Sequence, residues 1–263
     1  MSIISTLQEL SNDEIECVFE SEGDTPKIRV QQHKHYRWLV IDDDTIQSLV
    51  DVDDPSLIVV PAYQAMLFSL LFVEAPENCL VLGSGGGSLE RFLCQYFPQI
   101  KLIPIEKSRQ IISIARDYFF YPENIAVGNG RADHFLVDFP KSFDLIYCDI
   151  FESGRHPDCL ATELFHQHML ERLSENGVAA INLLTTDQVS LADVLTCARS
   201  VYPHVALYLV PGFQNAVLYV SAQAINKAEL FNAHLLQSVM RDVDLQSSVK
   251  RIEALQKRKA ASQ

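Results

Sequence analysis

The pattern of hydrophobic and polar residues changes near residue 60. Before this point, short segments of alternating apolar and polar residues are separated by polar turns, which is typical of antiparallel strands. The predicted strands are 18–20, 27–30, 36–41 and 45–50. We therefore expect residues 1–60 to form a small N-terminal antiparallel β unit.

From residue 61 the pattern is that of an α/β domain. Pro61 suits the first turn of a helix, and continuous apolar runs then alternate with amphipathic segments, which predicts a parallel sheet with helices on both faces. The predicted strands are 79–82, 101–105, 124–127, 143–148 and 177–183. The predicted helices are 62–73, 88–96, 109–119, 162–173 and 191–201.

Two further strands, 205–210 and 216–220, follow the last of these helices with no helix between them. This arrangement predicts an antiparallel hairpin at one edge of the sheet. We place the α/β domain at residues 61–225, and we expect residues 226–263 to form a helical tail with a basic end.

The composition is ordinary for a globular protein, with 48% hydrophobic residues, but the formal net charge is −13. Such an acidic chain is not expected to bind nucleic acid, because phosphate binding requires a basic surface. The charge suits a small cationic substrate, although many cytosolic proteins are acidic without such a role. The apolar run 65–73 is too short to cross a membrane, for which about 20 residues are needed.

The six cysteines show no Cys-x-x-Cys spacing, and Cys79 and Cys148 lie in apolar runs, so we expect reduced thiols rather than disulfides. No secretory leader is visible at the start, which together with the thiols predicts a cytoplasmic location. His166 and His168 would face different sides of a helix, so no metal site is expected there.

Glycine and polar residues follow the predicted parallel strands, at the edge where open α/β sheets bind ligands. The run Gly83-Ser84-Gly85-Gly86-Gly87 lies between the first strand and a helix, which lets the backbone approach a ligand closely. Glu106 ends the second strand and can accept hydrogen bonds from ribose hydroxyls. Asn129 and Gly130 follow the third strand, and Asp149 follows the fourth. Together these residues predict a nucleoside pocket.

Two classes of enzyme fit such a pocket: NAD-dependent dehydrogenases and transferases that use a sulfonium nucleoside. Three consecutive glycines followed by Ser88 differ from the spaced G-x-G-x-x-G of dinucleotide-binding folds. The predicted closing hairpin differs from those folds as well. We therefore favour the transferase, while the alternative remains that the glycines serve only tight packing.

Several segments, in their order along the chain, resemble the spermidine synthase (polyamine aminopropyltransferase) family. They are Leu39-Val40-Ile41-Asp42 through Ile46-Gln47, Tyr63-Gln64-Ala65-Met66-Leu67, the glycine run, Phe143-Asp144-Leu145-Ile146-Tyr147-Cys148-Asp149 and 160–182. The resemblance covers about residues 18–221. It implies a class I methyltransferase-like (Rossmann-like) sheet of seven strands with helices on both faces, preceded by a small antiparallel β unit. It also implies a homodimer or larger assembly.

The resemblance implies roles for individual residues. The donor, decarboxylated S-adenosylmethionine or S-adenosylmethionine, would be a co-substrate. It would be bound by Gln47, Gly83, Gly85, Gly86, Glu106, Asn129 and Gly130. Among these, Glu106 would hold the ribose, and the Asn129 oxygen would accept a hydrogen bond from the adenine amino group. Asp149 corresponds to the catalytic aspartate that takes a proton from the attacking amine, and Glu152 to a second acid. The acceptor, a small cationic amine, would contact Tyr63, Gln64 and Glu152.

The sequence also departs from the family pattern, mostly on the acceptor side. Gly86 replaces the aspartate of the glycine motif, Gln64 replaces a histidine, and Glu152 replaces an aspartate. The segment 211–215 lacks the tryptophan of the family. Because Gly86 removes a negative charge and would expose backbone N–H groups, we expect the donor site to tolerate intact S-adenosylmethionine.

Three functions follow from these observations. The first is transfer of an aminopropyl group from decarboxylated S-adenosylmethionine to a polyamine such as putrescine. The second is S-adenosylmethionine-dependent methyl transfer on the same scaffold, and the third is nucleoside binding without catalysis. We favour the first, because the N-terminal β unit with Gln47 and Tyr63 is a trait that ordinary methyltransferases lack; a dehydrogenase is the least favoured reading.

Overall fold

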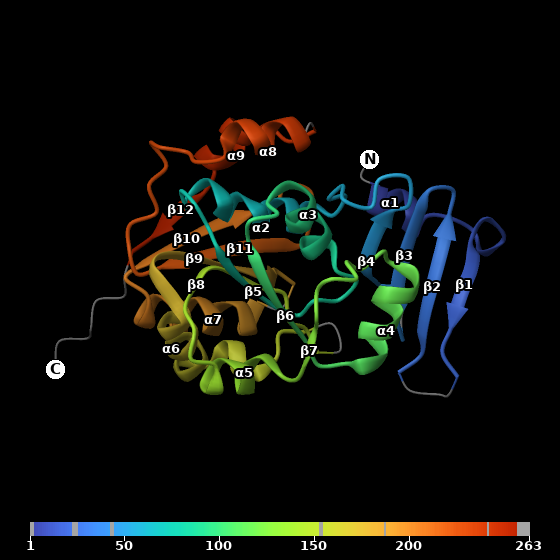
Figure 1. Cartoon of the computed structure of the whole chain (residues 1–263), viewed down its shortest axis with the longest axis horizontal. Helices are drawn as coiled ribbons and strands as arrows, with labels where there is room; N and C mark the ends of the chain where they lie inside the picture. The colour runs from blue at the N-terminus through green and yellow to red at the C-terminus, as the bar shows by residue number, and fades with distance from the viewer. Residues whose placement is uncertain are drawn as a thin grey trace.

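Two sheets form the framework of the molecule. Figure 1 shows a small antiparallel sheet near the N-terminus, drawn in blue, beside a larger mixed sheet with helices on both faces. The computed structural model describes residues 3–22, 26–42, 45–152, 155–186, 188–240 and 242–256. Within these residues, every helix is too short or too polar to cross a membrane. The α/β fold and the N-terminal β unit predicted from the sequence are confirmed.

The small sheet contains four strands in chain order, each antiparallel to the next. They are β1 (Glu16–Glu20), β2 (Ile28–His33), β3 (Tyr36–Ile41) and β4 (Ile46–Asp51), preceded by helix α1 (Ile3–Gln8) and a 3-10 turn (Asn12–Glu14). One face of this sheet shares a buried apolar cluster with helix α4 (Arg109–Tyr118), in which Val30 and Val50 lie with Ile111 and Ile114. This shared core fixes the small sheet beside the larger one.

The larger sheet is ordered β12-β10-β11-β9-β8-β5-β6-β7. Its strands are β5 (Asn78–Leu82), β6 (Lys101–Glu106), β7 (Gly128–Asn129), β8 (Phe143–Cys148), β9 (Leu173–Leu184), β10 (His204–Leu209), β11 (Asn215–Ser221) and β12 (Glu253–Leu255). Strands β5 to β9 run parallel, and β10 to β12 add antiparallel neighbours. The chain first builds outward from β5 through β6 and β7, and then crosses to β8 on the other side. Such a reversal opens a crevice at the carboxyl ends of the strands.

Helices cover both faces of the larger sheet (Figure 1). On one face lie α2 (Pro61–Met66) with its 3-10 continuation (Leu67–Leu71), α3 (Ser88–Tyr96), α8 (Ala233–Val239) and α9 (Leu245–Lys250). On the other lie α5 (Ala132–Asp138), a 3-10 turn (Asp158–Ala161), α6 (Glu163–Arg172) and α7 (Gln188–Val201). Alternate residues of β5 enter the two cores, Cys79 and Val81 on the first face, Leu80 and Leu82 on the second. This double burial explains the continuous apolar run of the strand.

Sequence analysis placed one strand of the α/β domain wrongly and missed one helix. The predicted strand 124–127 does not form; the outermost parallel strand is β7, which has two residues, Gly128 and Asn129. Helix α5, which follows it, was not predicted. An edge strand buries little surface, and both residues of β7 are exposed, so no hydrophobic pattern marks its position.

The C-terminal tail differs from the helical prediction. It contains α8 and α9 as expected, but β12 then pairs with β10 and makes the described sheet eight-stranded rather than seven-stranded. The basic end predicted for the tail lies largely outside the described residues, which exclude Arg241 and residues 257–263. Ile252, which precedes β12, is only 1% exposed and belongs to the same core as Val249 and Tyr208.

We therefore expect the tail to contribute to the stability of the α/β domain. Replacing Ile252 by Ala should lower the free energy of unfolding by about 3 kcal/mol, because it removes a buried side chain and leaves a cavity. The exposed neighbour Glu253 provides the control, and Glu253→Ala should change the free energy of unfolding by less than about 0.5 kcal/mol. Chemical denaturation of both variants measures the difference. Equal stabilities would show that the tail does not support the core.

Candidate active site

The predicted nucleoside-binding residues do gather at the carboxyl edge of the parallel strands. The segment between β5 and α3, Gly83 to Gly87, is called the glycine loop below. It contacts the ends of both neighbouring strands: the Gly85 N–H donates to Glu106 at the end of β6 (3.2 Å), and Gly83 packs against the backbone of Asp149 after β8. The Asn129 side chain donates to the Glu106 carbonyl (3.0 Å). These residues thus lie together at the edge of the sheet where the strand order predicts a crevice.

Glycine is required in this loop by backbone geometry. Gly83, Gly85 and Gly87 have φ of 85°, 51° and 76°, a region that other residues enter only with strain. A Cβ on Gly83 would lie 2.1 Å from the carbonyl oxygen of Asp149, and one on Gly87 would lie 2.3 Å from the ring of Tyr121. The glycines therefore allow both the loop conformation and its close approach to β8.

The N–H groups of the glycine loop are already bonded, which corrects one expectation. Those of Gly83 and Ser84 donate to Ile105, and that of Gly87 donates to Ser84. The Gly86 N–H donates to the Ser48 hydroxyl of β4 (2.9 Å), and a Cβ at position 86 would lie 2.8 Å from Ser48 Cβ. Replacing aspartate by glycine at position 86 therefore removes a charge without exposing a free N–H group.

Glu106 has a geometry that suits a ribose. The residue is 9% exposed, and its two carboxylate oxygens accept hydrogen bonds from the N–H groups of Gly85 (3.2 Å) and Ser108 (3.0 Å). Each carboxylate oxygen has a second lone pair. The backbone thus orients the carboxylate and leaves it capacity to accept hydroxyl hydrogen bonds.

Asn129 and Gly130 lie beside Glu106, but the Asn129 side chain does not present its oxygen as expected. Its NH₂ donates to the carbonyls of Glu106 and Lys107 (3.0 Å each), and its oxygen accepts from Arg109 Nε (2.9 Å). The adenine contact expected of this oxygen would require Arg109 to move. Gly130 donates its N–H to the Glu106 carbonyl (3.1 Å), and the space above its Cα is open.

Asp149 follows β8 and is held by side chains from two other elements. Its Oδ2 accepts from the Tyr63 hydroxyl of α2 (2.8 Å), and its Oδ1 accepts from the Asn182 amide of β9 (2.8 Å). Burial raises the pKa of Asp149, the bonds from Asn182 and Tyr63 oppose this change, and the charge of Glu106 adds to it. Burial and the Asp149 charge raise the pKa of Tyr63 far above its usual value, so this hydroxyl stays protonated and donates.

The structure brings Tyr63 to Asp149 but not the other predicted acceptor-side residues. The Gln64 amide donates to the Ile58 carbonyl (2.8 Å). The exposed carboxylate of Glu152 forms ion pairs with Lys107 (3.1 Å) and Arg131 (3.4 Å). Glu152 is therefore held by cations of the loops after β6 and β7. The role of Glu152 as a second acid stays a prediction.

Gln47, the remaining predicted residue, lies in a β-bulge of β4. Leu39 pairs with Ser48 and Val40 pairs with Ile46, so Gln47 is the extra residue between them. A bulge re-aims the side chains around it, and here the next residue is Ser48, which bonds the glycine loop. Gln47 thus adjoins Ser48, the residue that contacts the glycine loop, and a contact of Gln47 itself with a donor stays a prediction.

Sequence reasoning missed Asn182 and Asn215. Asn182 is 5% exposed near the end of β9, where its amide donates to Asp149, and its own oxygen accepts from the Asn215 amide at the start of β11 (3.1 Å). The signal was available: Asn182 interrupts the apolar run of residues 178–184, and a buried polar side chain needs a partner.

A second buried acid, Glu90 of α3, lies beneath the glycine loop. Its Oε1 accepts hydrogen bonds from the hydroxyls of Ser84 and Tyr121 (3.4 Å for Tyr121), and its other oxygen has no partner among the described residues. Burial raises the pKa of Glu90 to about 7, against the opposing effect of Ser84. The loop therefore stands on a carboxyl group that is largely protonated below neutral pH.

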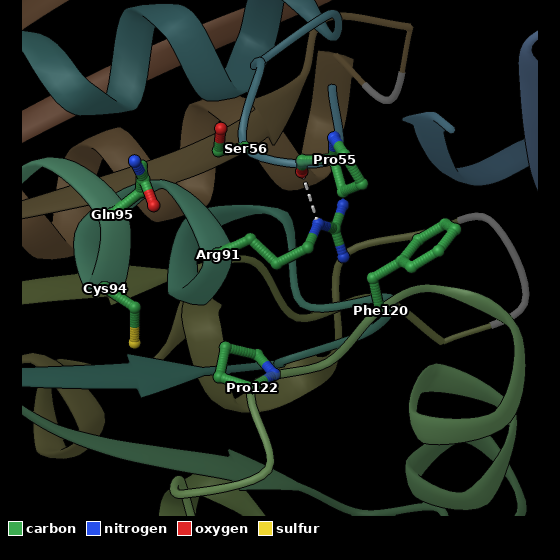
Figure 2. A pocket seen from close by; sticks show the side chains of 7 residues that line it. All are labelled: Pro55, Ser56, Arg91, Cys94, Gln95, Phe120 and Pro122. Atoms are coloured by element: carbon green, nitrogen blue, oxygen red, sulfur yellow. Dashed lines mark hydrogen bonds between the residues drawn. The ribbon is translucent and has the colours of Figure 1, made fainter. Parts of the chain in front are cut away.

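Arg91 contacts the same loop from the side of α3. Its guanidinium donates to the carbonyls of Pro55 (2.6 Å), Phe119 (2.7 Å) and Gly86. Figure 2 shows Arg91 and its bond to Pro55. A shallow hollow of about 310 Å³ lies beside it and contains none of the predicted site residues. Because its guanidinium N–H groups donate to backbone carbonyls, Arg91 stabilises the loop and does not serve as an anion-binding group.

Metal and disulfide chemistry are not visible at the site. All six cysteines are unpaired, with Cys79 and Cys148 buried. In the part of the chain that the structure describes, no three His, Cys, Asp or Glu side chains lie close enough together to hold a metal ion.

Comparisons with curated proteins give aminopropyltransferases and a methyltransferase; no family model matches the chain. The chain is 33% identical over 168 residues to the polyamine aminopropyltransferase of Chromobacterium violaceum, covering 62% of this chain and 64% of that protein. It is 29% identical over 167 residues to the corresponding enzyme of Neisseria meningitidis, with the same coverage. The match to a mouse eEF1A lysine and N-terminal methyltransferase is 24% over 161 residues, 57% of this chain and 23% of that protein. The chain thus spans less than two thirds of the length of the first of these relatives.

Solved structures agree with this grouping at the level of the fold. A probable spermidine synthase from Corynebacterium glutamicum superposes with a TM-score of 0.72 at 15% identity, covering 92% of this chain and 91% of that one. Spermidine synthase from Thermotoga maritima gives 0.63 at 20% identity, covering 80% and 74%. Human methyltransferase-like protein 13, in complex with SAH, gives 0.55 at 20% identity, covering 72% and 89%. The resemblance to the spermidine synthase family and the methyltransferase-like fold are therefore confirmed.

The glycine loop yields a stability test with an internal control. Replacing Gly83 by Ala should lower the free energy of unfolding by about 2–4 kcal/mol, since the methyl group meets the Asp149 carbonyl and φ is positive. Gly130→Ala, where a Cβ meets open space, should cost less than about 1 kcal/mol. Thermal or chemical unfolding compares the two variants, and a similar loss in both would contradict the packing described for Gly83.

Glu90 should make stability depend on pH. The pKa of Glu90 is about 7 in the folded protein and near 4.5 in the unfolded chain, so its protonated form favours the folded state. This contribution to the free energy of unfolding is fully present below about pH 4.5 and is lost as the pH rises through 7. The loss amounts to about 3 kcal/mol once the side chain is fully ionised. We expect Glu90→Gln, which cannot ionise, to remove this part of the decline. Unfolding free energies from pH 5 to pH 8 for both proteins measure it, and parallel curves would rule out the assigned protonation.

Proposed function

We propose that this chain, a divergent relative of the spermidine synthase family, transfers an aminopropyl group from decarboxylated S-adenosylmethionine to a small amine. The observation that carries the proposal is the position of Asp149. Its carboxylate accepts hydrogen bonds from Tyr63 and Asn182 at the carboxyl edge of the parallel strands, and its backbone packs against Gly83 of the glycine loop. An acid in this position can serve an amine that attacks a donor bound over the loop.

The donor side supports an adenosyl co-substrate. Glu106 retains hydrogen-bonding capacity for a ribose, and the glycine loop lies between it and Asp149. Among the similar solved structures, a spermidine synthase was determined in complex with the transition-state analogue AdoDATO, and human methyltransferase-like protein 13 in complex with SAH. The residues of this chain fit such a group on the ribose side; on the adenine side, Arg109 occupies the Asn129 oxygen.

The chemistry asked of Asp149 is proton removal and alignment. A free alkylamine is protonated at neutral pH, with a pKa of about 10, and is then no nucleophile. In the proposed reaction the amine gives its proton to the ionised Asp149 carboxylate, its nitrogen forms a bond to the donor carbon beside sulfur, and the carbon–sulfur bond breaks. The electron pair of that bond goes to sulfur, which leaves as a neutral thioether. The formal net charge of −13 favours approach of a cationic acceptor, and putrescine is the simplest candidate.

Methyl transfer is the second candidate, and Gly86 is the observation that favours it. Position 86 has no side chain, and Ser48 leaves no space for one, so no acidic group from this position opposes the carboxylate of intact S-adenosylmethionine. A curated relative and a structural neighbour are methyltransferases. The two candidates differ in the donor that the site accepts.

The decisive experiment identifies the product by mass spectrometry. The purified protein is incubated with decarboxylated and with intact S-adenosylmethionine, each with a panel of diamines and monoamines. We expect a product heavier than the amine by an aminopropyl group, formed only with the decarboxylated donor. A product heavier by a methyl group would contradict aminopropyl transfer and support methyl transfer, the second candidate. Donor binding by calorimetry without any product would overturn both transferase proposals.

Replacement of Asp149 tests the assigned mechanism separately. Asp149→Asn should lower turnover at least about 100-fold, because the group that accepts the amine proton is lost. Donor affinity measured by calorimetry should stay within about twofold. The exposed Asp117 of α4 provides a matched control, and Asp117→Asn should leave both quantities unchanged. Full turnover in Asp149→Asn would remove this residue from the reaction.

A further inference from the structure

A continuous chain of hydrogen bonds connects the closing hairpin to Asp149. The Asn215 amide at the start of β11 donates to the Asn182 oxygen (3.1 Å), and the Asn182 amide in β9 donates to Asp149 Oδ1 (2.8 Å). The Tyr63 hydroxyl donates to the other carboxylate oxygen (2.8 Å). Each of the two carboxylate oxygens is thus bonded by a side chain from a different element, α2 for Oδ2 and β9 for Oδ1.

The direction of these bonds is fixed by chemistry. An ionised carboxylate only accepts, so Asn182 must turn its NH₂ toward Asp149 and its oxygen away from it. That oxygen also only accepts, so Asn215 must turn its own NH₂ toward Asn182. If Asn215 were absent, no bond from β11 would prevent Asn182 from rotating its oxygen toward Asp149, where two acceptors would face each other.

The backbone holds Asn215 in place for this role. Asn215 pairs with Leu184 across the β11–β9 ladder, and its carbonyl accepts the Val210 N–H (3.0 Å) where the hairpin closes. Asn182 is 5% exposed and pairs with Val217 in the same ladder. Both amides therefore belong to regular strands, which position a side chain more rigidly than a loop does.

We infer that Asn182 and Asn215 form a two-amide relay that orients the Asp149 carboxylate and favours its ionised form. Asn182 acts on Asp149 directly, and Asn215 acts only through Asn182. Both are positioning residues. The relay is a property of the folded protein whatever the reaction, and only its effect on turnover rests on the proposed function.

The electrostatics agree in direction with this inference. Burial and the Glu106 carboxylate raise the pKa of Asp149, while the donors Asn182 and Tyr63 lower it. Loss of the Asn182 donor therefore leaves burial less opposed, and the pKa of Asp149 should rise. Activity that requires ionised Asp149 increases with pH through that pKa, so its acidic limb should move to higher pH.

The first measurement requires no activity. The ¹³C resonance of the Asp149 carboxyl group, assigned by its loss in Asp149→Asn, is titrated in the wild type, Asn182→Leu and Asn215→Ala. We expect a higher pKa in both variants. The exposed Asn124 provides a control, and Asn124→Ala should titrate like the wild type. An unchanged pKa in Asn182→Leu and Asn215→Ala would overturn the relay.

The second measurement tests whether Asn215 acts through Asn182. Asn215→Ala should shift the Asp149 titration in the wild-type background and have no further effect in Asn182→Leu. Independent, additive shifts would contradict the relay. Asn215→Asp, which cannot donate to the Asn182 oxygen at neutral pH, should have at least the effect of Asn215→Ala.

Turnover then separates this inference from the proposed function. We expect kcat to fall about tenfold in Asn182→Leu, with the acidic limb of its pH profile shifted upward and the KM for the donor unchanged. A purely structural role would lower stability without moving the pH profile, and would contradict the inference. If the wild type shows no turnover, the proposed function fails while the titration still decides the relay.

Discussion

The close approach of the glycine loop to the end of β8 is the constraint on which the site depends. The Asp149 N–H donates to the Leu82 carbonyl (2.8 Å), so the chain leaves β5 and β8 side by side. At that point any side chain on Gly83 would collide with the Asp149 carbonyl. Because Gly83 has no Cβ, the glycine loop can lie against Asp149. The proposed donor-binding loop and the proposed catalytic acid are therefore close together.

The loop is held in this position from several directions. Ser48 of the small sheet bonds Gly86 in front, Arg91 bonds the Gly86 carbonyl behind, and Glu106 bonds Gly85 from β6. Buried polar groups cost free energy unless they are paired, so each of these bonds is needed to keep the loop polar groups satisfied. Rigid pre-orientation is what a transfer reaction requires, because geometry errors of about 1 Å are costly in rate.

The sequence predicted the positions of the buried strands and of the polar residues that follow them. It did not predict which partner a polar side chain contacts. Apolar runs located β5, β6 and β8 because both faces of these strands are buried, and strand ends placed Glu106 and Asp149 at one edge. Nothing local shows that Glu152 turns toward Lys107 and Arg131, since those cations lie on other loops. The edge strand β7 was also not predicted, because its position depends on its pairing with β6 and not on its own composition.

In the proposed reaction, the contact between Ser48 and Gly86 would give the N-terminal sheet a part in selecting the donor. Ser48 lies directly after the bulge at Gln47, and its position depends on the register of β3 and β4. Its hydroxyl takes the Gly86 N–H, and its Cβ occupies the space into which a side chain at position 86 would extend. Glycine at 86 and serine at 48 are therefore a matched pair: an acidic residue in the loop would require the small sheet to withdraw. In the proposed reaction, the charge that the donor arm would meet therefore depends on how the small sheet packs against the glycine loop. Helix α4 holds the small sheet in place through the core that it shares with β2 to β4.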